Sequence, residues 1–575
     1  MACVESVEVE IDTSELAAII EDFDPDPEPE PEPEPDPEPE PEPDPDEEPT
    51  PSAFVLDSED DAVRFLNTMT FGATMPDVEA ALGRHAAELL AEEFEKPATL
   101  ILPQVLDQTS PTHLEILAFH NVAITADDQL RQRMTFALSQ ILVASGIATF
   151  NPEMVAYYID QLETNAFGNY RSLLEDVTFS PLMGTYLTYL GNERGDPVTG
   201  RVPDENYARE LMQLFTIGLV ELNPDGTPQT DFQGNGIETY TNDDISGLAR
   251  VFTGIGSSSG AFRFLNSAEA DRTPMITYPD RHSELEKTFL GLTIPAGTGP
   301  DQSIQSALDH LFNHPNVAPF ISRQLIQRFT QSDPSPAYVE RVASTFERGL
   351  YVADNGMEFG TGQRGDLEAT LAAILLDPSL FGEVAASNAG KIREPLLLFM
   401  NWARSFNATP NATDSSISPG TSRLAQIDDN GLQQQFFHST SVFNFYRPGF
   451  VPPQTMAGDS GRTAPEFQLI NEGTYIEIIN ELSIYVVQNL FNRPTERLAP
   501  DYGVELGIAD NASDLVDRVN LLLTGRRIPD SAIAEIEAIV SSIIIDDDDP
   551  EADRRARVDA AIVAVIARPE FFIQR

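Results

Sequence analysis

Past the first 56 residues, apolar side chains recur every three to four positions and seldom alternate with polar ones. This spacing predicts amphipathic α-helices, because about 3.6 residues complete one helical turn. The clearest examples are residues 131–144, 514–523 and 552–567. Strand-like alternation is nearly absent, and the best case is a short hairpin around residues 222–227. The pattern therefore predicts an all-α protein.

Prolines mark the corners between several of the predicted helices. Each of four prolines follows one apolar helical run and precedes another apolar segment: Pro181, Pro315, Pro378 and Pro569. Proline cannot continue a helix, but it fits the first turn of the next one. We therefore expect one large helical domain over residues 57–575, with residues 466–575 as an alternative helical subdomain.

The first 56 residues have a different composition. Among the first 50 there are 21 acidic residues and no basic one, and from Asp24 to Asp46 every second residue is proline. Proline fixes the backbone and like charges repel, so this run predicts an extended spacer of about 70 Å at ~3.1 Å per residue. Its role is either a tether or a disordered acidic tail without a partner.

The charge of the whole chain excludes some partners. The chain has 93 acidic and 35 basic residues, which gives a formal charge of −58. Nucleic acids and anionic membranes are bound through Lys and Arg, so neither is expected as a partner. No apolar run approaches the ~18–20 residues of a membrane span.

The single cysteine, Cys3, excludes a disulfide scaffold or a cysteine-rich metal site. No charged and apolar leader precedes it, as a signal peptide would require. A cysteine followed by a flexible linker is also how a mature bacterial lipoprotein begins. Cys3 is therefore either a lipid anchor, if the true start codon lies upstream, or an incidental cysteine in a cytoplasmic protein.

The most distinctive stretch is PDENYARELMQLFTIGL, residues 203–219. We expect a helix that begins at Pro203, with Glu210 on the polar edge of a buried stripe and Arg209 pointing elsewhere. A carboxylate at such a border has a raised pKa and is suited to acid–base chemistry or cation binding. The alternative is a structural partner for an arginine of a neighbouring helix.

A second stretch, RHSELEKTFLG at residues 281–291, follows a long irregular segment. It contains His282, which a loop position makes a candidate proton carrier or metal ligand, and Lys287. A plain polar surface histidine is the alternative. His310 and His314 are four residues apart, the spacing of metal-binding pairs on a helix, but no Glu lies between them and Pro315 breaks the helix.

Common catalytic signatures are missing from the sequence. There is no G-x-S-x-G elbow, no phosphate-binding glycine loop and no dinucleotide fingerprint. The sequence therefore assigns no cofactor.

Several motifs, in this order, resemble the DUF1800 family of uncharacterised bacterial proteins. They include LNTMTFGAT (66–74), the two stretches above, YTNDDISGLARVFTG (240–254), HPNVAPFISRQLIQRF (314–329) and SVFNFYRPGF (441–450). The resemblance implies a large, mostly helical protein, exported or associated with the cell envelope, with a sulfatase-like DUF1501 protein as partner. Two positions depart from the family pattern: Thr68 stands where an arginine is usual, and Ser283 follows His282 where an aspartate often does.

Two functional hypotheses follow. The first is a surface or interaction protein of the envelope or the extracellular space, held away from its anchor by the acidic spacer. The second is a hydrolase-like enzyme acting on an exported polymer. In it Glu210 and His282 would be the acid–base pair, and Lys287 or Arg209 would stabilise charge.

Overall fold

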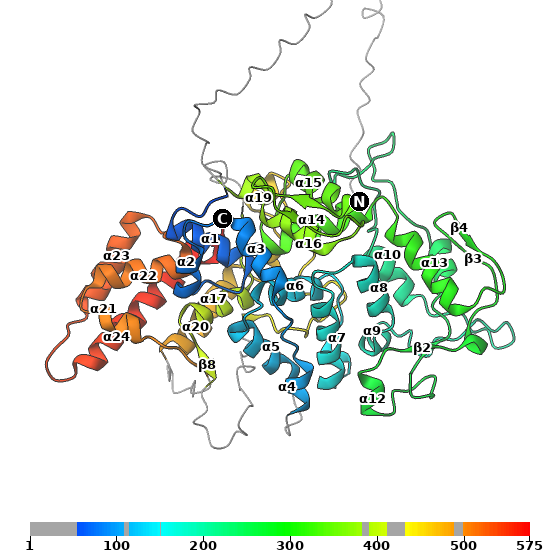
Figure 1. The fold of residues 1–575 in the computed structure, drawn as a ribbon, viewed down its shortest axis with the longest axis horizontal. Coiled ribbons are helices and arrows are strands. Elements are labelled where there is room, and N and C mark those ends of the chain that lie inside the picture. The colour runs from blue at the N-terminus through cyan, green and yellow to red at the C-terminus, as the bar shows by residue number, and fades with distance from the viewer. Residues whose placement is uncertain (1–53, 108–113, 150, 382–389, 411–431, 488–497) are drawn as a thin grey trace, which may run out of the picture. The chain divides into compact units, whose positions relative to one another are not determined.

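The computed structural model describes residues 54–107, 114–149, 151–381, 390–410, 432–487 and 498–575. Helices dominate this part of the chain, and its strands are two or three residues long (Figure 1). The predicted all-α class is confirmed. The acidic run and Cys3 lie outside the described residues, so the spacer and the lipid anchor stay predictions.

The first half of the described chain contains twelve α-helices. They are α1 (Glu59–Met69), α2 (Met75–Ala81), α3 (Ala86–Glu95), α4 (Leu102–Leu106), α5 (Leu114–Thr125), α6 (Gln129–Ser139), α7 (Pro152–Thr164), α8 (Tyr170–Thr178), α9 (Pro181–Tyr186), α10 (Asn206–Gln213), α11 (Asn242–Ala249) and α12 (Ala268–Asp271), with the 3₁₀ turns η1 (Gly146–Ala148) and η2 (Pro279–Arg281).

The second half continues in the same way. Its helices are α13 (Pro300–Phe312), α14 (Val317–Phe329), α15 (Pro336–Arg348), α16 (Leu367–Leu375), α17 (Pro395–Ser405), α19 (Met456–Asp459), α20 (Glu472–Val487), α21 (Gly503–Ile508), α22 (Ala512–Thr524), α23 (Asp530–Ser542), α24 (Pro550–Ile566) and α25 (Pro569–Phe572), with η3 (Pro378–Leu380) and η5 (Pro465–Gln468).

The strands pair only as small antiparallel ladders within the described residues. The pairs are β1 (Ile255–Gly256) with β2 (Ile276–Thr277), β3 (Lys287–Phe289) with β4 (Leu292–Ile294), β5 (Tyr351–Val352) with β6 (Glu358–Phe359), β7 (Lys391–Ile392) with β10 (Ile573–Gln574), and β8 (Thr409–Pro410) with β9 (Leu498–Ala499). They close turns and pin loops, and they do not form a layer of their own.

Three of the four proline corners lie as the sequence predicts, whereas Pro315 lies two residues before the first residue of α14 (Val317–Phe329). Three of the four prolines are the first residue of an element, namely Pro181 of α9, Pro378 of η3 and Pro569 of α25. The helix predicted to start at Pro203 begins three residues later, at Asn206. The Asp204 side chain accepts a hydrogen bond from the Asn206 backbone N–H at 2.8 Å, which delays the first turn.

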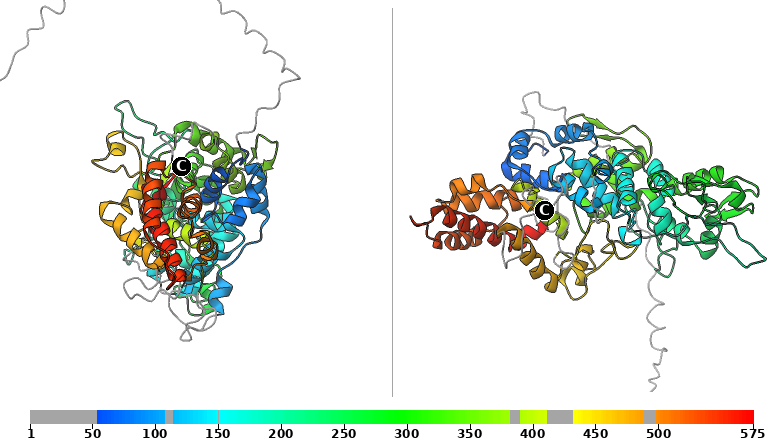
Figure 2. Two further views of the ribbon diagram at one scale, coloured as in Figure 1. Left: turned by 90° about the vertical axis from the view of Figure 1, so that its left-hand side faces the viewer. Right: turned by 90° about the horizontal axis from the view of Figure 1, so that it is seen from below.

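Residues Ser52–Arg575 form one compact unit. Within it α14, α15 and α16 pack on one another, and α22 packs against α23, α24, α1 and α17. In Figures 1 and 2 the helices α21–α24, coloured orange to red, gather at the end away from α13, β3 and β4.

The centre of this unit buries a charged network rather than apolar side chains alone. It consists of Arg133, Arg328, Lys391, Glu394 and Glu466. None of these five residues is more than 2% exposed. Glu394 accepts hydrogen bonds from the side chains of Gln140, Gln434 and Tyr446, and the Lys391 ammonium donates to two backbone carbonyls of α14. Three basic groups meet two carboxylates, so each carboxylate is essential to the balance of charge.

Candidate functional site

The structure buries Glu210 on α10, where it is 7% exposed. Burial raises the pKa of its carboxyl group, and the charge of Arg209 opposes that effect. Its Oε2 atom has no hydrogen-bond partner among the described residues. Burial raises the pKa of Tyr186 and of Tyr240, and the charge of Glu210 adds to the effect on both. These two phenols are therefore neighbours of Glu210.

His282 follows η2 and is only 2% exposed. Its Nδ1 lies 2.8 Å from the Thr253 carbonyl oxygen, and its Nε2 lies 3.3 Å from the Ser303 hydroxyl. Burial lowers the pKa of the imidazole, and the nearby Lys287 lowers it further. The imidazole is therefore neutral at pH 7 and has a polar neighbour at both nitrogens.

Lys287 begins β3 and has no exposed surface. Burial lowers the pKa of its ammonium group, which donates to the Leu285 carbonyl at 3.3 Å. Arg209 instead lies on the exposed side of α10, 3.9 Å from Glu205. In the described part of the chain no hydrogen bond or ion pair joins Glu210 to His282 or Lys287, so the acid–base constellation stays a prediction.

The two candidate metal ligands lie at the end of α13. His310 Nε2 is 2.9 Å from the Leu290 carbonyl, and His314 Nδ1 accepts the Asn316 backbone N–H at 3.2 Å. Across the described ranges no group of three or more His, Cys, Asp or Glu residues is placed to hold a metal ion. The same residues contain no helix with the length and hydrophobicity needed to cross a bilayer.

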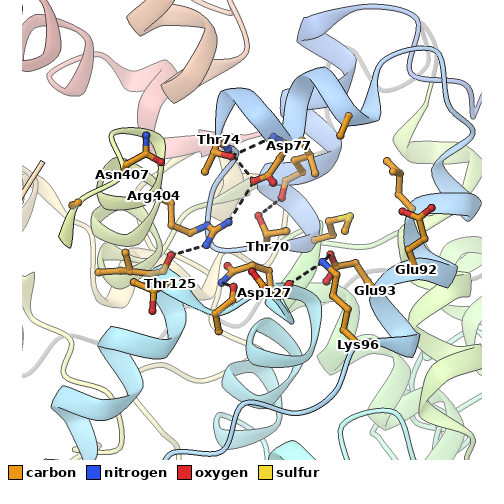
Figure 3. A pocket seen from close by; sticks show the side chains of 18 of the residues that line it. Thr70, Thr74, Asp77, Glu92, Glu93, Lys96, Thr125, Asp127, Arg404 and Asn407 are labelled. Atoms are coloured by element: carbon orange, nitrogen blue, oxygen red, sulfur yellow. Dashed lines mark hydrogen bonds and ion pairs between the residues drawn. The ribbon is translucent and has the colours of Figure 1, made fainter. Parts of the chain in front are cut away.

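A concave site lies elsewhere, between α1, α2, α3 and the end of α17. It is a cavity of about 420 Å³, and it is lined by side chains of both charges and by threonines (Figure 3). The charged lining residues are Asp77, Arg84, Glu92, Glu93, Lys96, Asp127 and Arg404.

One wall of the cavity is the turn after α1, within the 66–74 motif. Gly72 has a φ of +150°, and a Cβ atom there would lie 2.6 Å from the Asn401 Cα atom of α17. A glycine is therefore needed for this turn to pack on α17. The following residue pair, Thr74 and Asp77, forms a capping box at the start of α2.

Arg404 holds this wall in place from the last turn of α17. Its guanidinium donates to the carbonyls of Gly72 at 2.8 Å and Ile124 at 2.7 Å, and lies 3.5 Å from the Asp77 carboxylate. Burial lowers its pKa to about 10, so it stays charged at pH 7. Arg404 thus ties three separate segments around one side of the cavity.

The opposite wall is the end of α3. The Lys96 ammonium pairs with Glu93 and donates to the Asp127 carbonyl at 2.8 Å, while Glu93 also accepts the Leu130 backbone N–H at 3.2 Å. Burial raises the pKa of Glu93 even though Lys96 opposes it. Arg84 and Glu92 form a second pair with contacts of 2.6 and 3.1 Å.

The sequence pattern does not reveal this site, because its lining comes from residues 66–129 and 404–409. One signal was present: Arg404 stands inside an apolar helical run, and a buried arginine requires partners. The 66–74 motif was a second signal, although its chemistry is in the backbone of the turn.

A family model described as "Protein of unknown function (DUF1800)" matches residues 64–573. The curated proteins and the solved structures gave no match.

Proposed function

The chain belongs to the DUF1800 family of proteins of unknown function, and from this premise we propose that it is a binding protein that holds a small polar ligand in the cavity between α2, α3 and α17. Its place would be the cell envelope or the extracellular space, with the cytoplasm as the alternative. The binding role is the form of the surface or interaction hypothesis that the geometry supports best.

The observation that carries the proposal is the pairing of charges inside the cavity. Lys96 is paired with Glu93, Arg84 with Glu92, and Arg404 with Asp77. Six of the seven charged lining residues are thereby paired, which leaves many hydrogen-bond donors and acceptors at the cavity surface. Such a lining favours hydrogen bonding to a bound molecule over covalent chemistry.

The same lining indicates the class of ligand. Acidic and basic groups are nearly balanced, so neither a strong anion nor a strong cation is preferred. About 420 Å³ lies in the range of small-molecule sites. A hydroxyl-rich, uncharged molecule such as a mono- or disaccharide fits these conditions.

Isothermal titration with a panel of neutral sugars, amino acids and sugar acids tests this proposal. A neutral sugar should bind, and Lys96→Gln should weaken it at least tenfold, because the substitution breaks the Lys96–Glu93 pair at the cavity wall. Arg555→Gln is the matched control. Arg555 pairs with Asp559 on α24 at a similar exposure, and also donates to a backbone carbonyl. Equal losses in both variants, or no bound sugar at all, would contradict the proposal.

The hydrolase-like alternative rests on one observation, the buried carboxyl group of Glu210 with its unpartnered oxygen. A Glu210→Gln variant that abolishes hydrolysis of an extracellular polysaccharide while leaving the thermal midpoint unchanged would favour this alternative. The lipid anchor proposed at Cys3 is tested by palmitate labelling of wild-type and Cys3→Ser cells. The proposed DUF1501 partner is tested by co-purification with this protein.

A further inference from the structure

A second charged site lies in the loops after α9 and around η2. Its centre is the Glu193 carboxylate, which is 7% exposed and meets three arginines. Arg201 and Arg263 donate to its Oε2 atom at 2.5 and 2.6 Å, and Arg281 donates to Oε1. These three arginine side chains are 40%, 52% and 47% exposed, so the cluster reaches the surface.

The cluster gathers three arginines in a strongly acidic chain. Three guanidinium groups face Glu193, and Asp280 adds one exposed carboxylate 3.3 Å from Arg281. The adjacent Arg194 is balanced by Glu284 at 2.9 Å. Asp196 is a further nearby carboxylate, because hydrogen bonds from Val198 and Thr199 and also the charge of Arg201 lower its pKa. The cluster is therefore close to neutral, on a protein with a formal charge of −58.

Several guanidinium edges in the cluster remain unused. Arg263 contacts Glu193 through Nη2, and neither its Nε nor its Nη1 has a partner among the described residues. Arg281 lies over the Phe262 ring at 5.7 Å, and this ring packs edge-on against Tyr278 at 5.0 Å. A planar guanidinium held on a ring presents its remaining N–H groups in the fork that matches an oxyanion.

Hydrogen bonds that do not involve Glu193 also join these segments. Arg194 donates its N–H to the Arg281 carbonyl at 2.9 Å, and Gly191 donates to the Ile255 carbonyl at 2.9 Å. The Arg201 Nε atom also donates to the Arg194 carbonyl at 3.0 Å. These loops are thus joined by hydrogen bonds in addition to those of Glu193.

We propose that Arg201, Arg263 and Arg281 form a binding site for a tetrahedral oxyanion, either a free phosphate or sulfate ion or the same group carried as an ester on a larger molecule. Glu193 is the resident anion that orients the three side chains, and the incoming oxyanion binds to their outer N–H groups. The site is separate from the cavity at α2, α3 and α17, so it does not rest on the proposed function.

Substitutions of opposite effect test the site, with inorganic phosphate and sulfate as probes in isothermal titration at low ionic strength. Arg263→Gln should weaken binding about tenfold. Glu193→Gln should strengthen it about tenfold, because the competing carboxylate is removed while the arginines remain. Arg272→Gln is the control, because Arg272 also pairs with a glutamate and is 33% exposed, but lies outside the cluster.

The outcomes separate the alternatives. Tighter binding of glucose 6-phosphate or glucose 6-sulfate than of the inorganic ions would assign an ester, and equal binding would assign a free ion. No binding to the wild type and to a folded Glu193→Gln variant would overturn the proposal, as would equal losses in the Arg263 and Arg272 variants. If Glu193→Gln does not fold, the comparison of wild type with Arg263→Gln and Arg272→Gln decides.

Discussion

Glu163 at the end of α7 provides a test of the electrostatics of the fold. Its side chain is fully buried, and Oε1 accepts the Gln132 amide at 2.8 Å. Burial raises its pKa from 4.5 to about 8, and the negative charges of Asp128 and Asp160 add to the effect. We therefore expect Glu163 to be protonated in the folded protein at pH 7.

This shift makes stability depend on pH. The folded state binds the Glu163 proton more tightly than the unfolded chain does, so the contribution is fully present below about pH 4.5 and is lost as pH rises through about 8. At about 1.4 kcal/mol per tenfold change in proton affinity, the loss is on the order of 5 kcal/mol. This is an upper figure, because water entry and relaxation reduce the penalty for charging a buried group.

The perturbation is Glu163→Gln, which keeps the acceptor for Gln132 and cannot ionise. Urea unfolding followed by circular dichroism from pH 5 to pH 9 should give midpoints similar to wild type at pH 5. At pH 9 the variant should be more stable by about 2–5 kcal/mol. Glu153→Gln, on the same helix but 33% exposed, is the control and should follow the wild-type curve. A Glu163→Gln curve parallel to wild type over the whole range would refute the reasoning.

Two further pairs of substitutions give contrasting expectations. In the buried network, Glu394→Gln leaves three cations with one carboxylate and should lower the free energy of unfolding by about 3–5 kcal/mol. Lys391→Met leaves two cations with two carboxylates and should lower it by about 1–3 kcal/mol. Urea midpoints in the reverse order would contradict this expectation. Gly247→Ala in α11 would place a Cβ atom 1.8 Å from the Thr288 carbonyl oxygen and should lower the thermal midpoint by several degrees. In Gly507→Ala in α21 the added Cβ atom would meet nothing within 4 Å, so the thermal midpoint should stay unchanged or rise slightly.

The helices could be predicted because apolar spacing is a local property of the chain. The stretch 514–523 lies within α22, 552–567 extends one residue past the end of α24, and 131–144 overlaps α6, which ends at Ser139. The start of α10 was predicted three residues early, since it depends on the side-chain hydrogen bond of Asp204. The burial of Glu210 at the edge of that helix followed from the same periodicity.

The candidate site was less accessible to sequence reasoning, because it is built by contacts between distant segments. The cavity joins α3 to the end of α17, and the arginine cluster joins three loops to one carboxylate. His282 has a loop position in the sequence, which suggests exposure, yet it is buried between the Thr253 carbonyl and the Ser303 hydroxyl. Spacing along the chain contains no information on such enclosures.

Primary amines are rare in this protein, and one of them lies in the cavity wall. The chain has three lysines, and the side chains of Lys287 and Lys391 are inaccessible, whereas that of Lys96 is 36% exposed. Apart from the α-amino group, an acylating reagent should therefore modify the folded protein at Lys96. The rate at which the protein gains the mass of one acyl group then measures how much of the cavity is occupied, because a molecule bound beside Lys96 should slow the acylation of Lys96.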